Sequence, residues 1–591
     1  MKWRVSQNEL IEVAQGRQDA DLYIKDGTVI NVYSGEFLKQ NIAVYKDGIA
    51  YVGEDESPIG EHTDVIDAKG KYISPGFIET HSHPWVFYNP VSQTEKVLPL
   101  GTTTSVNDNL FFYLDMGAEK FKELLIDLRE LPGNFLWLVR LISQSDYPGE
   151  RDWFNQEDVR DLLQLDDVAG SAEVTRWPLL YKSDPFLLDT VDVVKNMGKV
   201  VDGHNAGCSY EKLNSIAASG VMACHEAIKA DEAINRLRLG LWTVLRNSSL
   251  RPDLSEVSKI ITEGKVDTSR VLMTTDGPHP SFIDKEGFAD GLVRQAVELG
   301  IPVMTAVQMV TINAATYLRM DNSLGGIAPG KKADLLILPD LVNFRPELVI
   351  SNGEIVAEHG QLKASLPEIN WTEYKLDDAF KIPKSVLENP DHYVFPQADT
   401  DEKVPVIHFL SNVITKRKDI ELPIVDGYAD IHGHEGLVYV ALIDRKKGDW
   451  MTRGVMEGFA VNLDGMASTY NTTTELLVAG RNPDAMAKAA ARVHELGGGV
   501  VIVDGDAIVL EIPLPLTGMM VTDASFDVAL KSHDKLLKYM QERGFPFHDI
   551  LYTLLFLTCD FLPGLRITPF GLYDVKKDDI VVQSTSLPVY K

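Results

Sequence analysis

The sequence predicts an α/β protein with a (β/α)8 barrel, a composite β-sandwich domain and a C-terminal α+β domain. One observation is an alternation of short apolar strands and helices over about 250 residues, the usual size of such a barrel. The other two are β-like segments on both flanks of this region and a separate mixture of strands and helices beyond a polar stretch. We expect the β-domain over 1–74 plus 323–389, the barrel over 75–322 and the C-terminal domain over 404–591.

The chain begins with short β-like segments joined by Asp-Gly turns, and the same pattern of strands and turns occurs again after the barrel region. Strand, turn and strand are expected over 21–30, 41–53 and 65–73. The β pattern resumes over 325–338, and Ser351-Asn352-Gly353 bridges a strand pair within 346–358. The simplest interpretation is one β-domain made from both segments, with the barrel inserted between them.

The remaining elements follow from hydrophobic periodicity and end signals. Helices are expected over 288–299, 306–318 and 483–496, and strands over 437–443 and 500–503. The Ala-rich helix over 483–496 ends at three consecutive glycines, a usual stop signal. The polar stretch over 390–403 is the expected linker before the C-terminal domain.

Charge and cysteine content narrow the classes of function. Lys and Arg number 57 against 86 Asp and Glu, and the formal net charge of −29 repels the phosphates of nucleic acids and anionic membranes. Cys208, Cys224 and Cys559 are too few for a disulfide framework. The sequence starts without a signal-peptide pattern, and the apolar stretch over 550–558 is too short to span a bilayer. We expect a soluble cytoplasmic protein.

The most informative motif is Thr80-His81-Ser82-His83, which closely follows Pro75-Gly76-Phe77. Residues two apart on a strand face the same side, so His81 and His83 can present two imidazoles to one metal ion. A second His-x-His, His432-Gly433-His434, contains a glycine and precedes a strand. That position favours a solvated loop, so we expect only the first pair to bind metal.

Four further strand ends carry the same kinds of side chain. His204 and His225 each end an apolar strand, Asp276 ends another, and Glu173 supplies a carboxylate between the first and second groups. Each alone is better explained as a core or loop residue, but a barrel places its catalytic side chains at the carboxyl ends of its strands. Histidine and carboxylate ligands without thiolates suit zinc, iron(II) or manganese, and such ions lower the pKa of bound water.

Together these features resemble the amidohydrolase superfamily and, within it, bacterial adenine deaminase. The resemblance covers nearly the whole chain. Besides the histidine pair, it rests on motifs at 100–104, 172–174, 202–204, 225–226, 236–240, 275–280, 326–335, 497–504 and 512–516.

The resemblance implies a two-metal centre that hydrolyses an aminopurine, converting adenine and water into hypoxanthine and ammonia. Carried over, its ligands would be His81 and His83 for one ion, His204 and His225 for the other, Glu173 as a bridge and Asp276 as a further ligand. The expected cofactors are two divalent ions, Mn²⁺, Fe²⁺ or Zn²⁺. The expected partner is a small purine-like molecule, and the expected assembly is a homo-oligomer, a dimer.

Four residues would act on the reactants. Asp276 would serve as general base toward the attacking water, and Glu226 would move the proton to the purine ring, unless it is a buried carboxylate that orients a neighbour. His279 and Asp108 are candidate substrate contacts, although a histidine between two prolines is equally often structural.

Several motifs depart from the adenine deaminase pattern at positions expected to line the substrate pocket. Pro84-Trp85-Val86 follows the histidine pair, Asn109-Leu110-Phe111 follows Asp108, Gly277 follows Asp276, and Thr-Tyr-Asn-Thr-Thr fills 469–473. Two alternatives therefore stay open: a hydrolase for another aminated heterocycle or cyclic amide, and a non-catalytic metal-binding scaffold. A scaffold does not need Asp276 and Glu226, so their retention argues against it.

Overall fold

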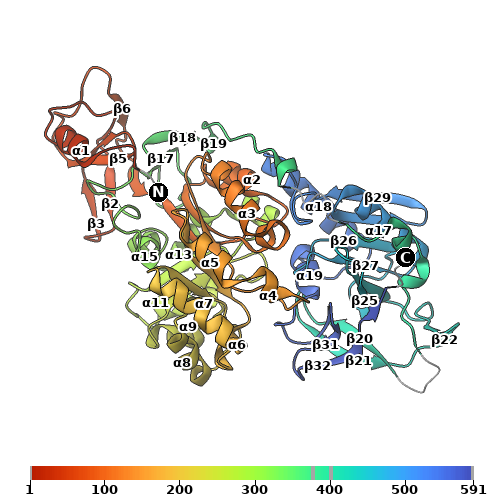
Figure 1. Ribbon diagram of the computed structural model, residues 1–591. Helices are drawn as coiled ribbons and strands as arrows, with labels where there is room; N and C mark the ends of the chain where they lie inside the picture. Colours follow the sequence, from red (N-terminus) through yellow and green to blue (C-terminus); the bar gives the residue numbers. More distant parts are fainter. Residues whose placement is uncertain (1–2, 375–379, 398–402, 588–591) are drawn as a thin grey trace.

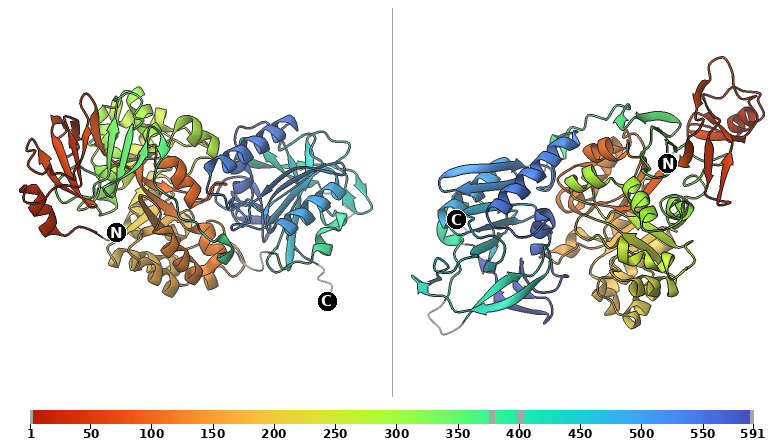
Figure 2. Two further views of the ribbon diagram at one scale, coloured as in Figure 1. Left: turned by 90° about the horizontal axis from the view of Figure 1, so that it is seen from above. Right: turned by 180° about the vertical axis from the view of Figure 1, so that it is seen from behind.

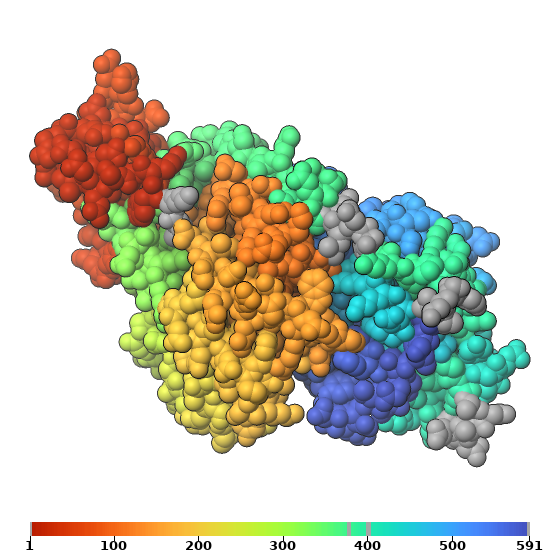
Figure 3. All heavy atoms as spheres, viewed as in Figure 1, coloured from red at the N-terminus to blue at the C-terminus, as the bar shows by residue number. Residues whose placement is uncertain are grey.

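The structure is a computed structural model that describes residues 3–374, 380–397 and 403–587, and it arranges them in three parts along a row (Figures 1 and 2). A β-rich part lies at one end, an α/β part over about 77–318 occupies the middle, and a C-terminal part over about 371–587 forms the other end. The space-filling view shows the middle part in contact with both neighbours (Figure 3). None of the helices in the described ranges has the length and apolar character needed to cross a membrane.

The β-rich part contains two sheets, and the second is built from both flanks of the chain. The first sheet has the order β5-β4-β1-β6 and the second the order β19-β18-β17-β16-β7-β2-β3. Strand β16 pairs antiparallel with β7, from Leu335 opposite Pro75 to Leu338 opposite Tyr72. The strands are β1 (Leu22–Lys25), β2 (Thr28–Asn31), β3 (Glu36–Lys39), β4 (Asn41–Tyr45), β5 (Gly48–Gly53), β6 (Asp64–Asp67), β7 (Tyr72–Pro75), β16 (Leu335–Leu338), β17 (Leu348–Ser351), β18 (Glu354–Glu358) and β19 (Gln361–Leu362).

Two of the expected strand–turn–strand units are not hairpins. At 21–30 and 65–73 the chain crosses from one sheet to the other, so β1 and β6 belong to the first sheet and β2 and β7 to the second. The crossing at Gly27 is tight, because a Cβ there would lie 2.4 Å from Cδ1 of Ile73. The unit at 41–53 does form an antiparallel hairpin, as predicted.

Eight parallel strands follow one another in the middle part and confirm its α/β character. Strands β8 to β12 form a sheet in consecutive order, β13 to β15 form a second, and β12 contacts β13 while β15 contacts β8. Every residue of β9 and β11 is buried, as expected for parallel strands covered on both faces. The strands are β8 (Phe77–Ser82), β9 (Thr102–Asp108), β10 (Asn134–Val139), β11 (Val168–Val174), β12 (Val200–Gly203), β13 (Ala223–Cys224), β14 (Trp242–Arg246) and β15 (Val271–Thr274).

Helices surround these strands, and one expected helix is broken in two. They include α2 (Pro90–Val97), α3 (Leu110–Leu128), α12 (Pro280–Glu286), α13 (Ala289–Glu298), α14 (Val303–Met309) and α15 (Ile312–Tyr317). The expected helix over 306–318 is interrupted at Thr311, whose backbone is not helical (φ −135°, ψ −96°). The carbonyl of Val310 accepts a hydrogen bond from the backbone N–H of Ile78 in β8 instead, so a long-range contact ends the helix.

The C-terminal part is built on a nine-stranded sheet. Its order is β21-β20-β25-β24-β27-β26-β28-β29, with β33 beside β25. The strands are β20 (Val404–Phe409), β21 (Thr415–Ile420), β24 (Leu437–Ile443), β25 (Trp450–Glu457), β26 (Gly465–Ser468), β27 (Leu476–Gly480), β28 (Gly499–Asp504), β29 (Ala507–Pro513) and β33 (Thr585–Ser586). Helix α17 (Pro483–Leu496) has the predicted bounds, with Asn482 capping its start and Gly497 in the left-handed conformation at its end.

The C-terminal part begins before the expected linker. Trp371, Leu387 and Tyr393 are buried in the same apolar core as the nine-stranded sheet. Of the expected linker over 390–403, residues 398–402 lie outside the described residues. The 3-10 helix Pro390–His392 belongs to the described section and contacts α17.

Two helices of the C-terminal part face the middle part. Helix α18 (Phe526–Glu542) packs against α2 and α12, and α19 (Ile550–Leu557) lies beside it. Figure 2 shows both between the C-terminal sheet and the middle part. They bring C-terminal side chains to the carboxyl ends of the parallel strands.

Candidate metal centre

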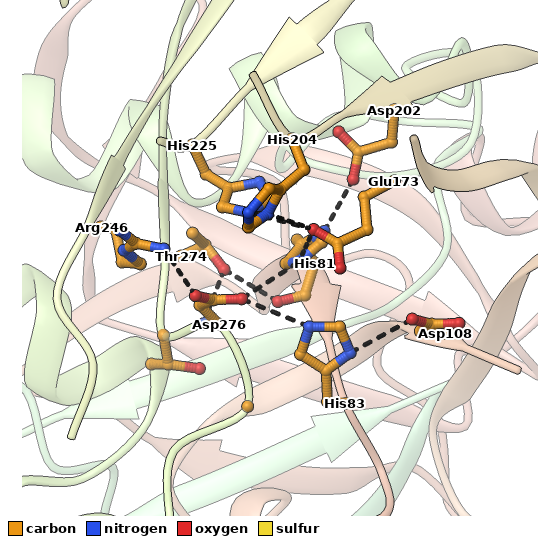
Figure 4. Close-up of polar contacts among 12 residues, drawn as sticks. His81, His83, Asp108, Glu173, Asp202, His204, His225, Arg246, Thr274 and Asp276 are labelled. Atoms are coloured by element: carbon orange, nitrogen blue, oxygen red, sulfur yellow. Dashed lines mark hydrogen bonds and ion pairs between the residues drawn. The ribbon is translucent and has the colours of Figure 1, made fainter. Parts of the chain in front are cut away.

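Four histidines and several carboxylates meet at the carboxyl ends of the parallel strands (Figure 4). His81 lies on β8 and His83 directly after it, while the other members come from or follow β11, β12, β13 and β15; these are Glu173, His204, His225 and Asp276. All these side chains are buried except that of Asp276, which keeps 17% of its surface exposed. The structure therefore brings together all six residues predicted as metal ligands.

His81, His83 and Asp276 form the first group. His81 Nε2 lies 3.2 Å from Asp276 Oδ1, and His83 Nε2 lies 3.3 Å from the same oxygen. One ligand atom from each residue lies within 4.8 Å of the others, which suits a shared ion. As expected for residues two apart on a strand, both imidazoles face the same site.

Glu173, His204 and His225 form the second group. Glu173 Oε2 lies 2.8 Å from His204 Nδ1 and 3.2 Å from His225 Nε2. The same oxygen lies 3.9 Å from His81 Nε2, so Glu173 stands between the two groups. This is the position that a bridging carboxylate requires.

Two further aspartates lie beside the histidines of the first group, and Asp202 is hydrogen-bonded to His81. Asp202 Oδ2 lies 2.7 Å from His81 Nδ1, and Asp108 Oδ2 lies 3.4 Å from His83 Nδ1. Carboxylates in this position fix the ring orientation and the tautomer of metal-binding histidines. Asp108, expected as a substrate contact, is buried against His83 and Arg140 and lies outside the cavity lining.

Burial and charge of the site suit a cation. His81 Nε2 and His204 Nε2 are buried without a hydrogen-bond partner among the described residues. The carboxylates of the network outnumber its guanidinium groups; they are Asp108, Glu173, Asp202, Glu226, Asp253 and Asp276 against Arg140, Arg246 and Arg251. Buried charges are normally paired or bound to metal, so the donor set fits divalent metal ions.

Three arginines of this network were missed from the sequence. Arg246, the last residue of β14, binds both Glu226 and Asp276, with 2.9 Å between its Nη1 and Asp276 Oδ2. Arg251 binds the other oxygen of Glu226 at 2.8 Å. The third, Arg140, donates to Glu173 Oε1 at 2.9 Å. A strand that ends in a charged residue could have indicated Arg246.

The histidines and arginines of the site change the pKa values of the Asp276 and Glu226 carboxyl groups. Burial alone would raise the pKa of Asp276, but the charge of His225 and the close contacts with the His81 and His83 imidazoles lower it well below its ordinary value. Burial also opposes ionisation of Glu226, and the charge of Arg246 outweighs it, so the pKa of Glu226 is well below its ordinary value. Both carboxylates are therefore ionised at neutral pH.

A small cavity opens onto the two groups. It measures about 50 Å³, whereas ligand pockets commonly have roughly 300–1,000 Å³. Its walls include Trp85 and Gln144 from the middle part and three side chains of the C-terminal part, Tyr552, Phe556 and Phe561. The cavity is therefore smaller than a usual ligand pocket.

His279, the other expected substrate contact, lies outside the cavity lining. Its Nδ1 accepts a hydrogen bond from the backbone N–H of Phe282 and caps α12. Its ring stacks on His533 of α18, with 4.4 Å between the ring centroids. The second His-x-His motif, at 432–434, is not part of any candidate metal group within the described ranges.

Comparison with known proteins gives the family. A model of the amidohydrolase family matches residues 72–356, and a model of the adenine deaminase C-terminal domain matches residues 412–579. A Bacillus cereus protein named "Putative adenine deaminase" is 34% identical over 99% of this chain and 98% of its own. "Putative adenine deaminase YerA" of Bacillus subtilis is 35% identical over 97% of both chains. "Adenine deaminase" of Moorella thermoacetica is 31% identical over 96% of both.

The chain is thus an amidohydrolase, a hydrolase acting on carbon–nitrogen bonds. The chain belongs to the adenine deaminase family.

Proposed function

We propose that this protein hydrolyses the amino group of an aminopurine, converting adenine and water into hypoxanthine and ammonia. The carbon–nitrogen bond to the amino group breaks, and a carbon–oxygen bond to water forms at the same carbon. The observation that carries this proposal is the convergence of both histidine pairs, Glu173 and Asp276 on one cavity in a chain whose relatives are named adenine deaminase.

Two carboxylates divide the proton transfers. Asp276 takes a proton from the attacking water, because its carboxylate is ionised and faces the cavity. Glu226 lines the same cavity, takes one of the two water protons and passes it to a ring nitrogen, while Arg246 and Arg251 fix its position. The other water proton passes from Asp276 to the amino group, which leaves as ammonia.

The proposed centre holds two divalent ions within a closed (β/α)8 barrel. The contacts of β8 with β15 and of β12 with β13 support closure of the eight strands. His81 and His83 would hold one ion and His204 and His225 the other, with Glu173 between them and Asp276 as a further ligand. When bound, such ions lower the pKa of water and supply a nucleophile near neutral pH.

An ammonia-release assay tests this function. Purified protein should release ammonia from adenine, lose that activity on treatment with a chelator, and regain it with Mn²⁺, Fe²⁺ or Zn²⁺. Elemental analysis should find one to two equivalents of metal per chain. Absence of ammonia from adenine with the metal-loaded protein, or full activity without metal, would contradict the proposal.

The chain offers a matched control for the metal arm. His81→Ala should lose bound metal and activity without global unfolding, whereas His432→Ala should keep both. His432 belongs to the other His-x-His motif, is exposed and lies in the C-terminal part. Equal metal content in the two variants would reject the site.

A second substrate class is favoured by the cavity wall. Trp85 is one of the residues at which this chain departs from the family pattern. Its Nε1 and the Oε1 of Gln144, which also lines the cavity, are buried without a hydrogen-bond partner among the described residues. These groups would select a ring with its own arrangement of donors and acceptors. The alternative substrate is therefore another aminated heterocycle or a cyclic amide. Ammonia release from a panel of aminopurines and aminopyrimidines separates adenine from the other aminated rings.

A further inference from the structure

The chain makes an unusual turn immediately after β15. Asp276 has φ 55° and Gly277 has φ 61°, so two consecutive residues adopt the left-handed conformation. This conformation is uncommon for a residue with a side chain, and it persists where the surroundings hold it. The direction of the Asp276 carboxylate depends on this turn.

The turn is held from two sides. On one side Gly277 packs against His83, because a Cβ on Gly277 would lie 2.5 Å from the Cβ of His83. On the other side the hydroxyl of Tyr552 donates to the carbonyl of Gly277 at 2.5 Å and lies 3.2 Å from that of Asp276. Tyr88 donates to the next carbonyl, of Pro278, at 3.0 Å.

Tyr552 reaches this turn from the C-terminal part. It lies in α19, whose start is capped by the side chain of Asp549, and it is 4% exposed. Its hydroxyl donates a hydrogen bond to the backbone of the turn, at the carbonyl of Gly277.

We propose that Tyr552 is a positioning residue, whose hydroxyl holds the 276–277 turn so that the Asp276 carboxylate remains between His81, His83 and Arg246. The inference rests on the proposed function, in which Asp276 is the base and a metal ligand. It assigns to the C-terminal part a direct share in the geometry of the reacting groups.

The test compares Tyr552→Phe with Tyr439→Phe. Tyr552→Phe keeps the ring in the cavity wall and removes only the hydroxyl. Tyr439 of β24 is also a buried tyrosine of the C-terminal part, and its hydroxyl donates to the carbonyl of Ala429 at 2.7 Å. Both variants therefore lose one buried hydroxyl, but only one loses bonds to the turn.

Two readouts are measured on cobalt-loaded protein. In Tyr552→Phe we expect kcat to fall about 10- to 100-fold with KM changed by less than about threefold, the range for residues that orient metal ligands. Transfer of bound Co²⁺ to a chelator should be about tenfold faster than in the wild type, and Tyr439→Phe should match the wild type.

Equal rates of cobalt loss in the two variants would overturn the inference, as would a rise in KM with unchanged kcat, which would place the hydroxyl on the substrate. If the wild-type protein releases no ammonia from any substrate, the proposed function fails. The cobalt measurement then still decides the role of Tyr552.

Discussion

Asp276 divides its two carboxylate oxygens between different partners. Oδ1 faces His81 and His83, whereas Oδ2 accepts a hydrogen bond from Arg246. One oxygen is thus directed to the candidate metal site, and the other is held by a guanidinium that stays charged. An amide of the same size would keep the shape but lose the base.

Asp276→Asn should therefore lower kcat by roughly two to four orders of magnitude, the range for a positioned general base. Bound metal should fall less, because the histidines and Glu173 remain. The measurement is kcat and metal content on the same preparation, with Glu226→Gln alongside to test the second proton carrier. Near-normal turnover of Asp276→Asn with its metal retained would refute the assignment.

Asp202→Asn should weaken metal binding although Asp202 is not expected to touch the ion. Its carboxylate holds His81 Nδ1 at 2.7 Å and fixes which ring nitrogen faces the site. Loss of such a partner typically reduces metal affinity or activity about 10- to 100-fold. A competition titration with a metal chelator measures the change, and an unaltered affinity would show that the ring is held by other contacts.

At the level of single residues, the sequence indicated the candidate metal ligands but not the side chains that hold them in place. His81, His83, His204 and His225 could be predicted because each lies at or just beyond a strand end. Arg251 could not, since its contact with Glu226 depends on how the loop after β14 folds back. The roles assigned to the ligands stay predictions until metal and turnover are measured.

The turn after β15 shows how one element constrains the site. Gly277→Ala should destabilise the protein and reduce turnover, because the added methyl group meets His83 in a left-handed backbone. We expect a loss of about 1–3 kcal/mol in the free energy of unfolding. Denaturant unfolding and kcat measure the two effects.

Gly207→Ala is the matched control for this substitution. Gly207 has φ 64° but no atom within 4 Å of an added Cβ. It therefore reports the backbone cost alone, and the difference between the variants reports the contact with His83. If both variants lose the same stability and activity, the packing of Gly277 on His83 contributes nothing.

Elements with local signals could be predicted, and those set by distant contacts could not. Helix α17 has its cap residue and its stop signal in its own sequence, so its bounds were predicted. The local sequence around Asp26-Gly27 predicts a hairpin, yet the strands on its two sides pair in different sheets. The break at Thr311 depends on Ile78, more than 200 residues away in the sequence.

The contact between the middle and C-terminal parts contains a titratable pair. His533 of α18 is fully buried, stacks on His279 and lies 2.7 Å from Ser281 Oγ and 3.3 Å from Asp534 Oδ1. Burial lowers the pKa of His533 to about 4, with the charge of His279 as the next cause. The unfolded chain binds this proton more readily, so stability present above pH 6.5 is lost as the pH falls toward 4.

His533→Gln should therefore weaken the pH dependence of stability. Between pH 7.5 and 5.0, the wild-type protein should lose about 2 kcal/mol more unfolding free energy than the variant. Urea unfolding at the two pH values measures this difference, whatever the variant costs at neutral pH. Parallel pH dependences in both proteins would show that His533 takes up its proton equally well when folded.

The composite sheet of the β-rich part determines when folding can finish during synthesis. Strand β7 emerges from the ribosome about 260 residues before β16, its antiparallel partner. At roughly 5–20 residues per second, the nascent chain waits some 13–50 s with that edge of β7 unpaired. The middle part can assemble in this interval, but the seven-stranded sheet cannot close. A chain released before residue 335 keeps an open strand edge, which is a template for pairing with other chains.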